Sequence, residues 1–293
     1  MGQQLSSTAT STPFLLITGV VLLAGVLHAI WNAIAHGLDD KLVTFTWISV
    51  VDTVLGACLL HFVAWPARAA WPFLLASAAL HVVYNGLLMQ AYRLGDFNQA
   101  YPLARGTSPW VVAIVGTLVV GERLGLPATA GVIVVSAGLA SLVFAGGTPS
   151  RGELPALGAA FATGLAIAGY TVLDGIGVRL SHSVPGYVAW LFLLQGPVIP
   201  TVAWLRRGPD LLRSMRPIWH LGVAGGIISV AAYALVLWAQ TQGALASVAA
   251  LRETGVIAGA IIGALVFHER FGRVRTVATI VVVAGIVLLQ FRA

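Results

Sequence analysis

The sequence predicts an all-α integral membrane protein of ten transmembrane helices, arranged as two inverted five-helix repeats. Three observations support this prediction. Of the 293 residues, 58% are hydrophobic and only 9% are charged, with a mean hydropathy of +0.92, which is incompatible with a water-soluble fold. The chain also contains ten apolar runs of membrane-spanning length. Finally, one short motif occurs twice, once in each half of the chain.

The ten apolar runs each hold roughly 19–24 residues, enough for a helix to cross about 30 Å of hydrocarbon. We expect transmembrane helices at residues 14–36, 43–65, 72–91, 97–120, 126–145, 154–175, 184–205, 218–240, 244–267 and 274–291. Residues 1–13 form an N-terminal tail without the basic region of a signal peptide, so we expect the first run to be retained. The connections are too short for an ATP-binding domain, so any transport would be driven by a gradient.

The two halves of the chain carry the same pattern. Aligning Leu103–Gly125 with Leu251–Gly272 pairs Arg105 with Arg252 and Glu122 with Glu269. Nearby offsets give further pairs: Trp31 with Tyr170, Trp47 with Trp190, and Asp52 with Gln195. The predicted repeats are residues 14–146 and 147–293. Because five is an odd number of spans, the second repeat enters the membrane from the opposite side, and a substrate site is expected near the midplane between the halves.

Ten spans in two halves, each closing its fourth helix with a GER or HER turn, resemble the EamA family of the drug/metabolite transporter superfamily over nearly the whole chain. Within that family, LHAIWNAIAHG, AYPLARG and ALRETG resemble a subgroup of bacterial permeases, some associated with phosphonate utilisation. The resemblance implies a carrier of the inner membrane that works by alternating access, usually as an exporter. It does not imply one substrate, because family members export amino acids, nucleosides and other small metabolites.

Four predicted spans carry polar residues at helical spacing, and such groups are costly in a membrane unless they face a cavity or a partner. The residues are His28, Trp31 and Asn32; His81, Tyr84 and Asn85; Tyr101, Arg105 and Ser108; and Tyr233 and Gln240. They predict one shared polar cavity with aromatic walls that binds substrate. The alternative is that each side chain hydrogen-bonds a neighbouring helix. Both interpretations stay open at this stage.

Arg105 cannot lose its charge, so inside a membrane it needs a carboxylate, carbonyl groups, water or an anionic substrate. Glu253 follows the repeat mate Arg252, but adjacent residues of a helix point about 100° apart. We therefore expect Glu253 to pair with Arg105, as a gate or a scaffold. An unpaired Arg105 would instead bind a substrate carboxylate or phosphonate.

Two acidic residues, Asp52 and Glu253, are the candidates for proton coupling. A paired structural acid is the alternative for Asp52. Pro102 and Pro109 predict local breaks in the fourth span, which would free backbone groups for ligands.

The predicted function is gradient-driven transport of small metabolites such as amino acids or organic anions, without a cofactor, a bound metal or enzyme activity. Two alternatives remain. One is a membrane-embedded hydrolase of a lipid-linked substrate that uses His28, His81 and Asp52; the other is a non-transporting accessory subunit. The predicted partners are a small-molecule substrate, the lipid bilayer and, as a further option, a second copy of the chain. No nucleic acid is expected, because the net charge of +6 is explained by loop arginines that set topology.

The distribution of basic residues predicts an orientation in the inner membrane. Connections on one side, between spans 1–2, 3–4, 5–6, 7–8 and 9–10, hold ten lysines and arginines, against four on the other side. The positive-inside rule therefore places both termini outside the cytoplasm. Resemblance to the family implies the reverse, with both termini inside.

Overall fold

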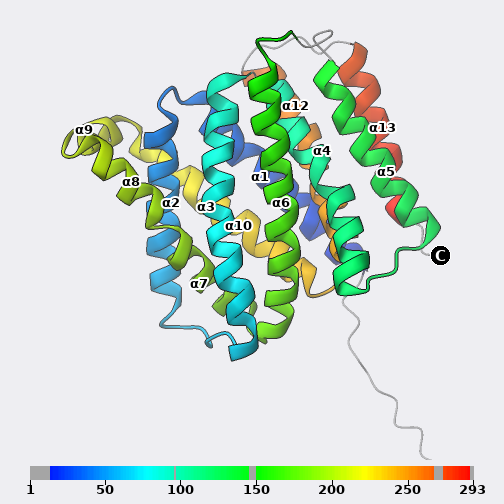
Figure 1. The fold of residues 1–293 in the computed structure, drawn as a ribbon, viewed down its shortest axis with the longest axis horizontal. Coiled ribbons are helices and arrows are strands. Elements are labelled where there is room, and N and C mark those ends of the chain that lie inside the picture. The colour runs from blue at the N-terminus through cyan, green and yellow to red at the C-terminus, as the bar shows by residue number, and fades with distance from the viewer. Residues whose placement is uncertain (1–13, 96, 145–149, 267–272, 291–293) are drawn as a thin grey trace, which may run out of the picture.

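The structure, a computed structural model, describes residues 14–95, 97–144, 150–266 and 273–290 (Figure 1). The predicted tail, residues 1–13, and Glu269 lie outside the described residues. The helices are α1 (Phe14–Gly37), α2 (Lys41–Leu59), α3 (Trp71–Leu94), α4 (Phe97–Val115), α5 (Leu126–Ser141), α6 (Leu154–Ser181), α7 (Val184–Gln195), α8 (Val198–Arg207), α9 (Asp210–Met215), α10 (Trp219–Gln240), α11 (Leu245–Arg252), α12 (Gly255–Val266) and α13 (Arg273–Gln290). The described residues contain no β-strand, which confirms the predicted all-α class.

Eight helical stretches of the described residues are long and apolar enough to cross a membrane. They correspond to the first eight predicted spans, so the chain is a multi-pass membrane protein. The last two predicted spans differ. The ninth is divided between α11 and α12, and the tenth contains the shorter apolar helix Thr276–Leu289.

Local sequence explains where several helices begin. Asp40 caps α2 by accepting a hydrogen bond from the Val43 N–H at 3.2 Å, and Ser183 caps α7 by accepting one from the Gly186 N–H at 3.1 Å. Proline occupies the first turn of α3, α5, α6 and α7, where its missing N–H costs nothing.

Two predicted boundaries were wrong. The helix α2 ends at Leu59 rather than at 65, ahead of Pro66, which favours extended backbone in the residue before it. The helix α6 continues past 175 to Ser181. It ends where His182 adopts a left-handed conformation, with φ of 55°.

The predicted break in the fourth span was also wrong. Pro102 and Pro109 both lie inside the continuous helix α4, because neighbouring helices and local adjustments can satisfy the carbonyl groups that a proline frees. The break occurs instead in the second repeat, at Glu253 and Thr254 between α11 and α12.

The seventh predicted span bends where α7 meets α8, at Gly196 and Pro197. A Cβ atom at Gly196 would lie 2.9 Å from the Ser49 carbonyl oxygen of α2, so glycine permits this close approach. Pro197 has no N–H to continue the hydrogen-bond ladder. The chain direction therefore changes, and α8 departs from the bundle toward α9 (Figure 1).

The helices pack in a pattern that is unchanged when the two halves are exchanged. The helix α1 packs mainly against α10 and α12, and its counterpart α6 packs against α3 and α4. The pairs α2 with α7 and α5 with α13 each join counterparts directly. The main interfaces therefore lie between the two halves of the chain.

The α11–α12 break brings two glycines into backbone contact. A Cβ atom at Gly25 of α1 would lie 2.7 Å from the Arg252 carbonyl oxygen and 3.0 Å from the Gly255 nitrogen. No side chain fits between these backbones without moving one of them. The contact fixes α1 against the point where the ninth span is interrupted.

We predict that Gly25→Val lowers the free energy of unfolding by about 1–3 kcal/mol, because the added methyl groups overpack this contact. The matched control is Gly19→Val on the same helix, where a Cβ atom meets nothing within 4 Å. Thermal unfolding of the purified protein in detergent measures both variants. Equal midpoints for the two variants would contradict the prediction.

Candidate functional site

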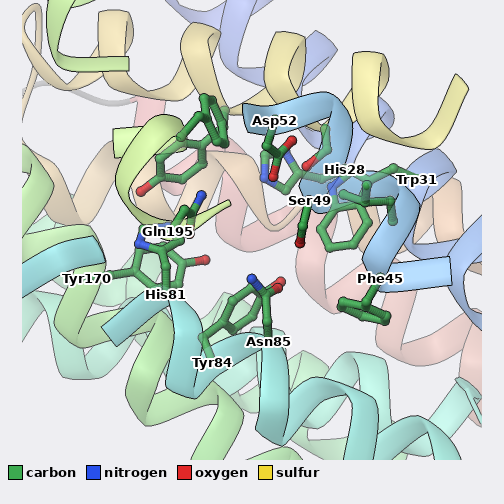
Figure 2. A pocket seen from close by; sticks show the side chains of 14 residues that line it. His28, Trp31, Phe45, Ser49, Asp52, His81, Tyr84, Asn85, Tyr170 and Gln195 are labelled. Atoms are coloured by element: carbon green, nitrogen blue, oxygen red, sulfur yellow. The ribbon is translucent and has the colours of Figure 1, made fainter. Parts of the chain in front are cut away.

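A buried cavity lies between six helices, three from each half of the chain (Figure 2). The open space within it is about 40 Å³, which holds a few water molecules at most. Its lining residues are His28 and Trp31 of α1; Phe45, Ile48, Ser49 and Asp52 of α2; His81, Tyr84 and Asn85 of α3; Tyr170 of α6; Phe192 and Gln195 of α7; and Ser229 and Tyr233 of α10.

The predicted faces of two helices meet in this cavity. His81, Tyr84 and Asn85 all line it, as do His28 and Trp31. Both members of two predicted repeat pairs also line it, Trp31 with Tyr170 and Asp52 with Gln195. Residues at matching positions of the two halves thus surround one space.

Both cavity histidines have a fixed hydrogen-bond geometry. His28 Nδ1 lies 2.9 Å from the Ala24 carbonyl oxygen, and His81 Nδ1 lies 3.0 Å from the Ser77 carbonyl oxygen. A carbonyl oxygen only accepts, so Nδ1 carries the proton in each neutral ring. The Nε2 atom of each ring is then a hydrogen-bond acceptor. The ring of His81 also stacks on that of Tyr170, with 3.9 Å between centroids.

Three buried polar atoms around the cavity have no hydrogen-bond partner in the described part of the chain. They are Asp52 Oδ1, Gln195 Oε1 and Trp31 Nε1. Leaving such an atom unsatisfied in an apolar interior costs about 1–3 kcal/mol. Their position in a cavity wall makes an acceptor on Asp52 and a donor on Trp31 available to a solute.

The sequence analysis missed Asp174, a fully buried acid on α6. It accepts a hydrogen bond from the Tyr187 hydroxyl at 2.8 Å and another from the Tyr233 hydroxyl. Tyr233 lines the cavity and Asp174 does not, so Asp174 fixes the hydroxyl group of a cavity residue from outside the lining. An acid inside an apolar helix is a signal in itself, but the predicted span ended at 175 and placed this residue at the membrane surface.

Arg105, Arg252 and Glu253 form a buried charged cluster outside the cavity lining. Arg252 donates hydrogen bonds to Glu253 Oε1 from Nε at 3.1 Å and from Nη2 at 3.0 Å. Arg105 Nη1 lies 3.7 Å from the other oxygen, Oε2. The Arg105 guanidinium also lies 5.2 Å from the centre of the Tyr101 ring. One carboxylate therefore contacts both arginines of the repeat pair.

The expectation that Arg252 and its neighbour Glu253 do not face each other was wrong. That expectation assumed a continuous helix, in which adjacent side chains diverge by about 100°. Arg252 is the last residue of α11, and Glu253 lies in the turn before α12. The break turns Glu253 toward both arginines.

Five residues that were predicted to line the shared cavity lie outside its lining: Asn32, Tyr101, Arg105, Ser108 and Gln240. Asn32 donates to the His28 carbonyl at 2.7 Å and accepts from the Tyr92 hydroxyl at 2.7 Å. Gln240 donates to the Thr171 carbonyl at 3.3 Å. These contacts match the alternative reading, in which polar residues join neighbouring helices.

A second ion pair joins the halves at the end of the bundle where α6 ends. Arg179 Nη1 contacts Glu122 Oε1 at 3.1 Å. Its Nε donates to the Gln240 carbonyl and its Nη2 to the Gly243 carbonyl. Glu122 Oε2 accepts from the Leu245 N–H at 2.9 Å and so caps α11. Four segments from both halves are tied together at this end.

At the opposite end, Arg207 of α8 forms an ion pair with Asp40, the cap of α2. Partial burial raises the pKa of Asp40, but hydrogen bonds from Arg207 and from the Val43 N–H outweigh that effect and keep the pKa below its ordinary value. Asp40 and Arg207 are partly exposed, so solvent weakens this pair.

Comparison with known proteins finds one family match and a similar solved fold. Residues 154–291, just under half of the chain, match the EamA-like transporter family. One of 29 matching solved chains, described only as "Crystal structure of protein", has a TM-score of 0.72 and 17% identity, and the match covers 95% of this chain and 99% of that one. That likeness shows the fold alone. No curated protein matches the chain.

We predict that Glu253→Gln destabilises the protein more than Arg105→Gln does. The first change leaves two buried cations without a carboxylate, at a cost of about 3–5 kcal/mol. The second leaves the Arg252–Glu253 pair neutral and hydrogen-bonded, at a cost of about 2 kcal/mol or less. Unfolding midpoints in detergent measure the difference, and equal midpoints would show that Glu253 does not serve both arginines.

Proposed function

We propose that this protein is a gradient-driven carrier of small amino-group-bearing metabolites, with amino acids as the favoured class, and that the cavity between α1, α2, α3, α6, α7 and α10 binds the solute. The single observation that carries the proposal is this cavity, which collects ionisable, polar and aromatic side chains from both halves inside the membrane-spanning helices. Such residues are costly in a bilayer and mark solute pathways.

The chemistry of the lining favours an ammonium group over a simple organic anion. Asp52 presents a carboxylate oxygen without a protein partner in the described residues, while Arg105 and Arg252 lie outside the lining. Tyr84, Tyr170 and Tyr233 surround the same space, and aromatic faces attract cations. The Nε2 acceptors of His28 and His81 would accept further hydrogen bonds from the same ammonium group.

The small volume of the cavity supports a transport cycle in which the cavity changes shape. Solute sites in proteins typically measure about 300–1,000 Å³, whereas the open space here is about 40 Å³. The cavity would therefore widen toward one membrane surface and then the other, which is alternating access. The packing pattern, unchanged when the halves are exchanged, supports two inverted repeats of five spans, with α11 and α12 together forming the ninth.

The two end contacts would act as gates in this cycle. The Glu122–Arg179 contact is the more enclosed and ties four segments, so it would close the α6 end firmly. The Asp40–Arg207 contact is more exposed and would open more easily. Export from the cell across the inner membrane is the direction proposed, with the α2–α8 end facing the cytoplasm as the loop charges predict.

We predict that proteoliposomes loaded with unlabelled amino acids accumulate labelled amino acid by counterflow, and that Asp52→Asn reduces the initial rate at least about tenfold by removing the cavity carboxylate. The matched control is Asp210→Asn, an exposed acid paired with Arg213 outside the cavity. This control should keep the wild-type rate.

The same vesicles test the alternatives. Accumulation of organic acids or phosphonates in place of amino acids would contradict the proposed solute class. Because His28, His81 and Asp52 do line one cavity, hydrolysis of a lipid-linked substrate is assayed in parallel. Turnover without counterflow would favour the hydrolase, and the absence of both activities would favour the accessory subunit.

A further inference from the structure

A long groove lies on the outer side of α3 and α8, apart from the cavity. It has an open volume of about 850 Å³ and runs between these helices, with the start of α2 at one end. The bend at Gly196 and Pro197 creates it, because α7 packs against α3 but α8 turns away. The groove is lined only by described residues.

The groove combines apolar side chains on α3 and α8 with a charged end, where Lys41, Arg93, Arg206 and Arg207 outnumber Asp39 and Asp40. On α3, Val82, Gly86, Met89 and Arg93 lie at i, i+4, i+7 and i+11, which is one helix face. On α8, Val198, Val202 and Arg206 lie at i, i+4 and i+8. Both stripes end with arginine at the same end of the bundle, because α3 and α8 both finish there.

At the basic end, some of the positively charged side chains have no ion-pair partner among the described residues. Arg207 is paired with Asp40, and the Lys41 ammonium donates to the His36 and Leu38 carbonyls. Arg93 and Arg206 are exposed, and neither has a carboxylate within 4 Å in the described part of the chain. These two arginines flank the groove and can contact an anion together.

The length of the groove matches one leaflet of a bilayer. From Val82 to Arg93 the helix advances eleven residues, or roughly 16 Å at about 1.5 Å per residue. One leaflet contributes about half of the 30 Å hydrocarbon thickness. An acyl chain along the valines therefore places its headgroup at the arginines.

We propose that this groove binds one anionic phospholipid, with its phosphate between Arg93 and Arg206 and an acyl chain against Val82, Gly86 and Val202. A water-filled solute entrance is the rival, but its deep part would need polar lining, and here that part is apolar. The proposal does not depend on the solute. It adds that the lipid packs behind the cavity wall, since Gly86 lies beside the cavity residue Asn85.

Native mass spectrometry of the full-length protein in detergent, with phosphatidylglycerol or phosphatidylethanolamine added, tests the proposal. We expect one retained phosphatidylglycerol and weaker retention of phosphatidylethanolamine. Each of Arg93→Gln and Arg206→Gln should weaken retention about fivefold. The control pair, Arg213→Gln and Arg216→Gln, changes arginines at the same end that do not line the groove and should have no effect.

A second variant tests the acyl chain separately from the charge. A Cβ atom at Gly86 meets nothing within 4 Å, so Gly86→Leu fills the groove without disturbing the fold and should abolish retention. Gly158→Leu on α6, which is equally unobstructed, is its control. Unchanged retention in Gly86→Leu would overturn the proposal. Displacement of phosphatidylglycerol by inorganic phosphate alone would also overturn the proposal. Loss of counterflow in Gly86→Leu while the lipid is still retained would overturn it as well.

Discussion

The fold depends on one buried carboxylate that contacts two buried arginines. Arg105 and Arg252 come from matching positions of the two halves, and both contact Glu253. A buried arginine keeps its charge, so its burial without this partner would cost several kcal/mol. Glu253 reaches both only because the ninth span is interrupted after Arg252, and the interruption in turn requires Gly25 and Gly255, where α1 meets the break.

The contacts that join the two halves are therefore separate from the cavity. The charged cluster lies outside the cavity lining, while the lining carries one acid, two histidines and aromatic rings. A cluster that ties α4 to α11 favours a scaffold or gate over an anion fork for Arg105. Asp174 has a comparable supporting place, because it fixes Tyr233 through a hydroxyl hydrogen bond. Polar residues behind the wall position those that line the cavity.

Helical spacing predicted part of the cavity lining. The i, i+3, i+4 pattern of His81, Tyr84 and Asn85 was enough to place all three on one face. The repeat alignment paired Tyr170 with Trp31 and Gln195 with Asp52, but it did not mark Tyr170 or Gln195 as cavity residues. Spacing could not separate Trp31, which lines the cavity, from Asn32, which bonds Tyr92. The two residues are adjacent in α1, so their side chains point about 100° apart. The position of α3 decides which of them faces the cavity.

What the sequence could not predict depends on helix ends and breaks. Asp174 was missed because the predicted span stopped six residues before the end of α6. The Arg252–Glu253 contact was missed because a helix break has no unique local signal. Pro102 and Pro109 suggested a break in the first half, yet the interruption lies in the second half, between α11 and α12, and no proline occurs in those two helices or between them. Tertiary contacts at Gly25 and Glu253 decide that location.

The most direct test of the central claim is solute protection of a cysteine in the cavity wall. In a Cys58→Ser background, Ser229→Cys is labelled with a maleimide, and Ser214→Cys on exposed α9 is the control. We predict that the transported amino acid slows labelling at position 229 at least about fivefold and leaves position 214 unchanged, because a bound solute excludes reagent from the cavity. Equal labelling at position 229 with and without a solute that the protein demonstrably transports would contradict the account.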